Sequence, residues 1–254
     1  MTYVIREASP ASDGRVGYSG PMSGYISPEH HPAFEEYCET IFELAEDGLS
    51  VIQARIAERL DVSRPAVSEM IRRLSDDGLV ITDDSGLITL TPDGETLAQT
   101  MVRRHRLAER FLTDVLDLSW AEAHHEAGKW EHVISPRVED AIVERLGDPT
   151  TCPHGNPIPG SDYVEPDLIA LAEAGHDADL VITRIPEELE FTPGLLEFLE
   201  ENQVLPGQTA RVLAASPDGT TTLEVDDKVV GISAFTAERI LVIQPSPATV
   251  DSPA

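Results

Sequence analysis

Two short segments of the sequence contain residues whose types and spacing suit metal binding. In a helix over residues 101–116, Met101, His105, Glu109, Leu112 and Leu116 lie along one stripe. Four of these side chains fit an apolar core. The carboxylate of Glu109 does not, because burying an unpaired charge is costly. The stripe therefore predicts that His105 and Glu109 face a polar partner.

The second segment, residues 124–132, places His124, Gly128, Glu131 and His132 on one helix face. If the two helices face each other, imidazole and carboxylate groups converge with no thiolate among them. That donor set suits a borderline-to-hard divalent transition metal. The alternative is a pair of surface helices with ordinary polar faces.

The chain has 254 residues, 41% of them hydrophobic, and a formal net charge of -28. Its basic residues are arginines except for Lys129 and Lys228, and its acids are spread along the whole length. This pattern predicts a protein adapted to a very salty cytoplasm, such as that of a halophile. The alternative is an acidic partner-binding protein, although such proteins more often carry their acids in one block.

The cysteine content and the hydropathy indicate the compartment. Cys38 and Cys152 form no CxxC motif and predict no disulfide framework, in agreement with a reducing compartment. No apolar run approaches the roughly 18 residues of a membrane span, and the N-terminus has no apolar signal core. We therefore expect a cytoplasmic protein with no membrane segment.

The N-terminal part has the pattern of a winged helix-turn-helix. Residues 1–30 are predicted to form a flexible arm, followed by a helix over 33–46. Two further helices, 52–60 and 63–74, surround a tight turn, with Ser63 as N-cap and Pro65 in the first turn. Residues 79–82 and 87–90 then form a hairpin. The predicted DNA-binding domain spans 31–98; the alternative is a three-helix cluster with a structural hairpin.

The charge of this module favours DNA. Residues 50–80 contain five arginines and five acids, so the segment is neutral within a strongly acidic chain. The N-terminal end of the second helix of this motif reaches base edges. The predicted DNA contacts are Ser63, Arg64, Pro65, Ala66, Ser68, Arg72 and Arg73, the last two at phosphates.

The remaining chain divides into helical and β-rich parts. Helices are predicted from Pro92 to about 118, from Ser119, and over 135–146, followed by an ordered loop from Cys152 to Gly160. These elements form a helical dimerisation and metal-binding region over 99–163. After a linker at 164–178, five short strands and a helix at 194–201 predict a small β-barrel over 179–244, with a disordered tail at 245–254. The fold class is α+β.

Several segments together resemble the diphtheria toxin repressor family of metal-dependent transcription regulators. They are 54–60 (ARIAERL), 65–68 (PAVS), 104–114 (RHRLAERFLTD), 130–132 (WEH) and 155–160 (GNPIPG). The resemblance covers about residues 33–244. It implies that the barrel is SH3-like (ferrous iron transport A-like). It also implies a homodimer that binds palindromic operators when loaded with Fe2+ or Mn2+.

The resemblance also implies ligands. His105, Glu109 and His124 match an ancillary metal site, and Glu131 and His132 match the primary site. Glu36 and Glu39 fall where the manganese branch has carboxylates, and Glu36 replaces a Met of the iron branch. Gly128 departs from the pattern, because the iron branch has Cys there and the manganese branch Glu.

Other polar residues receive no role in this interpretation. The barrel segment from Phe191 to Leu195 offers no ligand in register, and the neighbouring Glu190 and Glu197 are left unassigned. We expect His125, His154 and His176 to be surface histidines and Cys152 to have a loop role.

The sequence thus predicts a DNA-binding repressor of metal uptake genes that is activated by Fe2+ or Mn2+ and is not an enzyme. Iron is expected to be the more important physiological signal, although both metals should activate. One alternative is a metal-independent winged-helix regulator that uses the barrel to bind partners. The other is a metal-dependent hydrolase, which is disfavoured because no additional catalytic base is evident.

Overall fold

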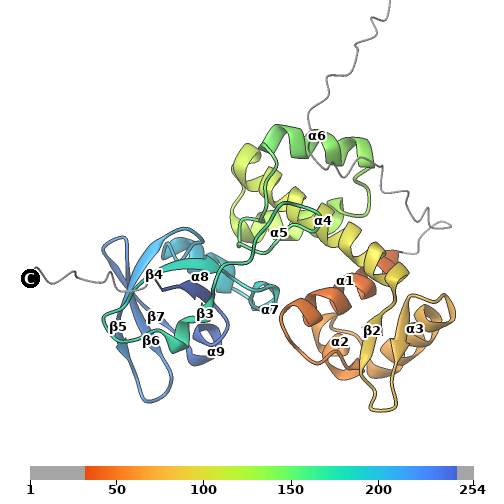
Figure 1. Ribbon diagram of the computed structural model, residues 1–254, viewed down its shortest axis with the longest axis horizontal. Helices are drawn as coiled ribbons and strands as arrows, with labels where there is room; N and C mark the ends of the chain where they lie inside the picture. Colours follow the sequence, from red (N-terminus) through yellow and green to blue (C-terminus); the bar gives the residue numbers. More distant parts are fainter. Residues whose placement is uncertain (1–31, 245–254) are drawn as a thin grey trace, which may run out of the picture.

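The computed structural model describes residues 32–244, and the predicted N-terminal arm and C-terminal tail lie outside these residues. Figure 1 shows three parts in chain order: a small helical domain with a hairpin, a group of longer helices, and a β-rich domain at the other end. This arrangement confirms the predicted α+β class with a winged helix, a helical middle region and a C-terminal barrel.

The winged helix contains α1 (Pro32–Glu46), α2 (Gln53–Arg59), α3 (Arg64–Asp76), β1 (Val80–Thr82) and β2 (Ile88–Leu90). The two strands pair antiparallel, with Val80 opposite Leu90. The Ser63 side chain accepts a hydrogen bond from the backbone of Ala66 and begins α3 as predicted. The core contains Ile41, Ile56, Val67, Leu74, Ile88 and other apolar side chains from all five elements and from α4.

The helical part contains α4 (Pro92–Leu116), α5 (Trp120–Trp130) and α6 (Pro136–Leu146). Ser119 and Glu122 form a capping box at the start of α5, and Ser135 caps α6. Met101 and Leu112 of the predicted stripe on α4 are buried, whereas Leu116 is 47% exposed because the helix ends there. The first part of α4 packs against α1 and β2 of the winged helix. The same helix also packs against α5 and α6.

The β-rich domain is a six-stranded antiparallel sheet with the strand order β3-β8-β4-β5-β6-β7. Its strands are β3 (Ile169–Ala170), β4 (Asp179–Arg184), β5 (Thr209–Ala215), β6 (Thr221–Val225), β7 (Lys228–Ile232) and β8 (Leu241–Ile243). Its short helices are a 3-10 turn (Leu171–Glu173), α7 (Glu187–Glu190), α8 (Leu195–Glu201) and α9 (Ala234–Ala237). The five predicted strands are all present.

Several short elements were not predicted from the sequence. β3 and the 3-10 turn lie inside the segment predicted as a linker, because Ile169 pairs with Val242 and Leu171 is fully buried in the barrel core. α7, between β4 and α8, was not expected either. These elements, like α9, span only two to four residues and are too short to show a recognisable helix or strand periodicity.

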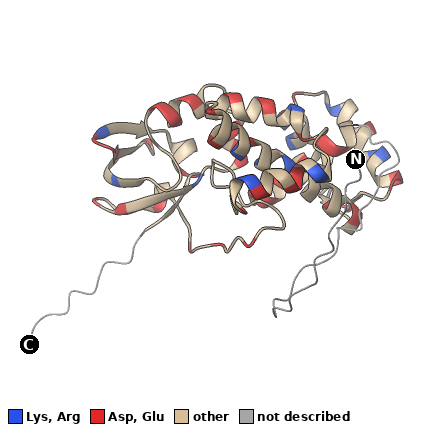
Figure 2. Cartoon of the chain, turned by 90° about the horizontal axis from the view of Figure 1, so that it is seen from above, with Lys and Arg blue, Asp and Glu red and all other residues tan. Residues whose placement is uncertain are grey.

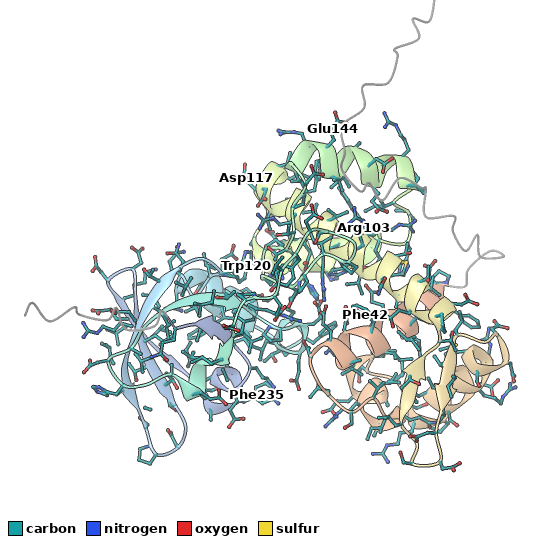
Figure 3. All side chains as sticks on the ribbon, in the orientation of Figure 1. Phe42, Arg103, Asp117, Trp120, Glu144 and Phe235 are labelled. Carbon is teal, nitrogen blue, oxygen red and sulfur yellow. The ribbon has the colours of Figure 1, made fainter. Side chains whose placement is uncertain are left out.

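The barrel packs against the helical part instead of extending away from it. Trp120 of α5 belongs to the hydrophobic core of the barrel and is 8% exposed. Figure 3 shows this residue where the two parts meet. Gly155, in the loop after α6, has φ +87°, and a Cβ there would lie 2.1 Å from the carbonyl oxygen of Thr183 in β4. In this arrangement α7 lies beside the end of α1, the end of α2, and α5.

Acidic residues occur in all three parts of the molecule (Figure 2). None of the helices within residues 32–244 is both long and apolar enough to cross a membrane.

Candidate metal centre and DNA-binding surface

His105 and Glu109 lie one turn apart on α4, both buried, and each contacts residues of α5. His105 Nδ1 is 2.5 Å from Glu131 Oε2, and its Nε2 is 3.3 Å from Glu109 Oε1. His124 Nδ1 lies 3.0 Å from the same Glu109 oxygen. The structure therefore brings together four of the predicted ligands in the way that the facing-helix interpretation requires.

α1 contributes carboxylates from the opposite side. Glu39 is 7% exposed. One of its carboxylate oxygens lies within 4.8 Å of a ring nitrogen of His105 and a carboxylate oxygen of Glu131. Glu35, which was not predicted, is 2.7 Å from Nδ1 of the predicted ligand His132. Glu36 is exposed and lines the opening of the same cavity. Of the two α1 carboxylates predicted, Glu39 is thus the more deeply placed.

α7 of the barrel supplies two further carboxylates, Glu187 and Glu190. Glu190 Oε2 lies 3.1 Å from His124 Nδ1, and Glu187 lies with His105 and His124 in one group of potential ligand atoms. The sequence-based search for a barrel ligand left both of these carboxylates unassigned. It relied on residues 191–195, whereas the carboxylates come from the preceding turn. The sequence does contain one sign of these ligands: Glu187 and Glu190 are spaced i, i+3, on one face of a helical turn, shortly after a strand.

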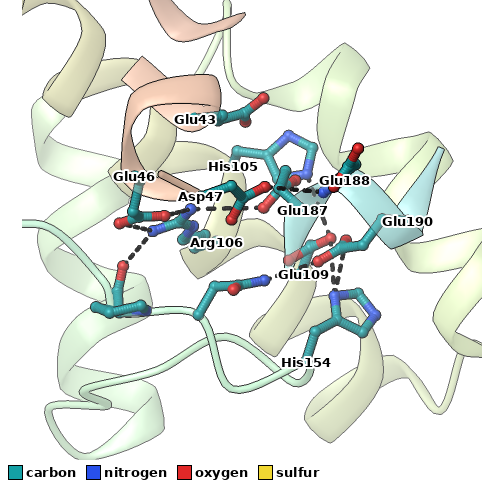
Figure 4. A network of polar contacts seen from close by, with 12 residues as sticks. Glu43, Glu46, Asp47, His105, Arg106, Glu109, His154, Glu187, Glu188 and Glu190 are labelled. Carbon is teal, nitrogen blue, oxygen red and sulfur yellow. Dashed lines mark hydrogen bonds and ion pairs between the residues drawn. The ribbon is translucent and has the colours of Figure 1, made fainter. Parts of the chain in front are cut away.

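His154 was expected at the surface but is fully buried, so that prediction was wrong. Its Nδ1 lies 2.9 Å from Glu190 Oε2 and 3.6 Å from Glu109 Oε1 (Figure 4). Its ring packs edge-on against Trp120 at 4.6 Å. Cys152 is buried beside it, and the sulfur falls in one ligand group with Glu109 and His154. His125 and His176 are exposed, as predicted.

We call these residues together the acid–histidine cluster. Its members are Glu35, Glu39, His105, Glu109, His124, Glu131, His132, His154, Glu187 and Glu190. A cavity of about 490 Å³ is lined by most of them and by Glu36, Glu43 and Gly128. Gly128 is exposed at its edge, and a Cβ added there would meet nothing within 4 Å.

The protonation of the cluster shows how strongly it attracts cations. Burial lowers the pKa of His124, but the hydrogen bonds that its imidazole donates to the carboxylates of Glu109 and Glu190 outweigh burial and raise this pKa to about 10. Burial, together with the charge of Glu190, raises the pKa of Glu187 to about 7. Burial and the neighbouring Glu131 likewise raise the pKa of Glu39 well above its ordinary value. Protons on these groups therefore compensate for an excess of buried negative charge.

The donor set fits a divalent metal ion. Among the described residues, Glu39 Oε1 and His154 Nε2 are buried with no hydrogen-bond partner, and Glu39 lines the cavity. Buried polar atoms in proteins are normally satisfied, so unpartnered atoms facing a polar cavity indicate a missing ligand. Imidazole nitrogens and carboxylate oxygens suit Mn2+ and Fe2+.

The predicted DNA-binding residues lie on α3 and at its N-cap. Ser63, Arg64, Pro65, Ala66, Ser68 and Arg72 are exposed at or near α3, and Arg73 is partly buried. Two of the arginines have protein partners: Arg72 pairs with Glu69 at 2.7 Å and Asp76 at 2.8 Å, and Arg73 stacks on Phe34. Arg64 forms no ion pair among the described residues and is the arginine of α3 most available to DNA.

Two family models match the chain. "Iron dependent repressor, N-terminal DNA binding domain" covers residues 31–86, and "Iron dependent repressor, metal binding and dimerisation domain" covers residues 91–160. The iron-dependent repressor IdeR of Mycobacterium tuberculosis is 40% identical over 202 residues, which are 75% of this chain and 87% of the relative. The diphtheria toxin repressor of Corynebacterium diphtheriae is 40% identical over 175 residues, 69% of this chain and 74% of the relative.

Solved structures agree with these sequence matches. A manganese-dependent transcriptional repressor in complex with manganese has a TM-score of 0.75 and 32% identity, covering 83% of this chain and 99% of that one. IdeR of T. acidophilum has a TM-score of 0.69 and 30% identity, covering 83% and 97%. The chain therefore belongs to the iron-dependent repressor family, of which the diphtheria toxin repressor is a member.

Proposed function

We propose that this protein is a homodimeric DNA-binding repressor of metal uptake genes, activated by Fe2+ or Mn2+ in the cytoplasm. The observation that carries the proposal is the position of α1. One side of this helix places Tyr37, Cys38, Ile41 and Leu44 in the core of the winged helix. The other side places Glu35 and Glu39 in the acid–histidine cluster. A metal ion bound there would therefore fix the DNA-binding domain relative to α4 and α5.

Two groups of side chains suit two ions. The first contains Glu39, His105 and Glu131, with His132 and Glu36 at the edge of the cavity. The second contains Glu109, His124 and Glu190. When bound, the metal supplies the positive charge that the buried carboxylates lack and joins side chains from different elements.

The gain in DNA affinity follows from linkage. If metal binds more tightly when α1, α4 and α5 have the spacing required by the operator, DNA binding and metal binding must favour each other equally. In a dimer, the same restraint sets the distance between the two copies of α3. The helical part exposes Leu116, Val133 and Val138, which lie within the residues matched by the dimerisation model and support self-association there.

DNA binding measured against a panel of metals tests the proposal. A duplex selected from genomic fragments in Mn2+ would be titrated at high KCl with Mn2+, with Fe2+ under anaerobic conditions, and with chelator. We expect binding with both metals and little with chelator. The Glu131→Ala variant should lose the response. Glu144→Ala serves as control, since this exposed residue of α6 lies away from the cluster (Figure 3). Equal DNA affinity with metal and with chelator would contradict the proposal.

A further inference from the structure

The short helix α7 contacts two different parts of the protein. One side presents Glu190 to His124 and His154, at 3.1 and 2.9 Å. On the other side, the backbone N–H of Glu188 donates a hydrogen bond of 3.0 Å to Asp47 Oδ2, just after α1 (Figure 4). In Figure 1, α7 extends from the barrel towards α1 and α2. The same four residues therefore contact both the acid–histidine cluster and the DNA-binding domain.

Arg59, the last residue of α2, reaches α7 from the helix-turn-helix. Its guanidinium carbon lies 4.3 Å from the centroid of the Phe191 ring, and Phe191 is the residue that ends α7. The arginine side chain is only 6% exposed, and its Nη atoms face Glu43 at 3.7 Å and Asp47 at 3.9 Å. The Phe191 ring also packs edge-on against the imidazole of His124, with the ring centroids 5.4 Å apart.

These contacts form a continuous path from a candidate ligand to the helix that precedes the recognition helix. Arg59 lies on α2, which packs against α3. Its guanidinium stacks on Phe191, whose ring rests against His124, and the residue before Phe191 is Glu190. When an ion holds His124 and Glu190 together, the position of Phe191 is fixed, and Arg59 gains a fixed surface on which to stack.

We propose that Arg59 is a positioning residue that, through its stack on Phe191, couples metal occupancy at α5 and α7 to the orientation of the helix-turn-helix. Through this coupling, the barrel increases the affinity for DNA when metal is bound. This inference rests on the proposed function, because it assumes that the cluster holds metal. The planar guanidinium is essential, because a lysine could keep the attraction to Glu43 and Asp47 but would not stack in the same way.

The test compares DNA binding with saturating Mn2+ and with chelator, and the measured quantity is the ratio of the two affinities. A general loss of stability would weaken both affinities, whereas loss of coupling lowers the ratio. From the range of measured cation–π interactions, Phe191→Ala should reduce this ratio by about two- to thirty-fold. Phe191 is 47% exposed, so its truncation leaves no buried cavity. Arg59→Lys provides a second variant that keeps the charge.

The matched control is Phe235→Ala. Phe235 is 46% exposed, and Arg239 stacks on it at 3.7 Å, but both residues belong to the barrel. We expect this variant to keep the ratio of the unmodified protein. An unchanged ratio in both Phe191→Ala and Arg59→Lys would overturn the inference while leaving the proposed function intact. The absence of any Mn2+ response in the unmodified protein would instead overturn the proposed function itself.

Discussion

Replacing Gly128 by Glu should add a metal ligand and, separately, change the stability of α5. Gly128 lies within α5, at the edge of the cavity lined by Glu131 and His132, and a Cβ there meets nothing within 4 Å. Its φ is not in the left-handed region, so a side chain is tolerated without strain. Because glycine inside a helix costs about 1 kcal/mol relative to alanine, Gly128→Ala should stabilise the metal-free protein by up to that amount.

The Glu variant gains less in the absence of metal. Its carboxylate would stand three residues before Glu131, and like charges at this spacing cost about 0.2–0.5 kcal/mol. With Mn2+ the sign reverses, because the added carboxylate becomes a ligand. A charge-assisted hydrogen bond in proteins contributes about 1.5–3 kcal/mol. If the contact between the added carboxylate and Mn2+ contributes as much, the dissociation constant for Mn2+ should fall by roughly 10- to 150-fold.

The assay is titration calorimetry with Mn2+ on the unmodified protein, Gly128→Ala and Gly128→Glu, with thermal unfolding in chelator as the stability measurement. Gly128→Ala should bind Mn2+ as the unmodified protein does and unfold about 2–4 °C higher for each kcal/mol gained. Gly128→Cys should shift the preference towards softer metals, because thiolate is a softer ligand. If Gly128→Glu and Gly128→Ala bind Mn2+ equally, residue 128 does not face the ion and the proposed ligand positions are wrong.

Three other changes have definite expected results. Arg64→Ala should weaken binding to the selected duplex by about 1–3 kcal/mol with unchanged Mn2+ binding, as measured by fluorescence anisotropy and calorimetry. Glu190→Ala should lower the number of Mn2+ ions bound per chain without abolishing binding, which equilibrium dialysis would count; an unchanged number would exclude Glu190 as a ligand. The folded-state pKa of Glu187 is raised from 4.5 to about 7, so its proton stabilises the metal-free protein fully below pH 4.5, and this contribution is lost as the pH rises through about 7. Chemical unfolding in chelator should show a loss of about 3 kcal/mol over this range that is absent in Glu187→Gln, and an equal loss in that variant would refute the assignment.

Local signals in the sequence were sufficient for most of the helices. Ser63 and Ser119 each cap a helix as predicted, Ser135 caps α6, and prolines occupy the first turns of α3, α4 and α6. These features act within four residues of chain, so neighbouring residues alone determine them. The facing of His105 and Glu109 towards α5 could also be predicted, because the helical period fixes which side chains share a stripe.

The less predictable features depend on contacts between distant segments. His154 lies in a loop rich in Pro and Gly, where no periodicity indicates burial, and Trp120 and Glu190 enclose it from other elements. Glu39 belongs to an acidic row on α1 that, in a chain with a net charge of -28, looks the same as a solvated face. One distinguishing signal was available: Glu35, Glu39 and Glu43 are spaced four apart, and like charges at this spacing destabilise a helix unless other groups compensate for them.

The charges in the cluster explain why a proton cannot replace the metal as an activating signal. Seven acids of the cluster and its rim are buried: Glu35, Glu39, Glu43, Glu109, Glu131, Glu187 and Glu190. Arg106 and Arg184 are buried and pair chiefly with Glu46 at the far end of α1. Among the described residues, arginines reach only two of the seven acids: Arg106 lies 3.5 Å from Glu187, and Arg59 lies 3.7 Å from Glu43. The excess is therefore neutralised either by protons on carboxylates and imidazoles or by divalent ions, and metal binding must release protons.

A proton neutralises one group, or at most a pair that shares it, and it leaves the helices free to separate. A metal ion binds several side chains at once, and here those side chains come from α1, α4, α5 and α7. Of these two kinds of cation, only the metal can therefore join α1 of the winged helix to α4, α5 and α7 through several coordinated side chains. Acidification should stabilise the metal-free fold without restoring DNA binding, and this separation of stability from DNA affinity is what a sensor specific for metal requires.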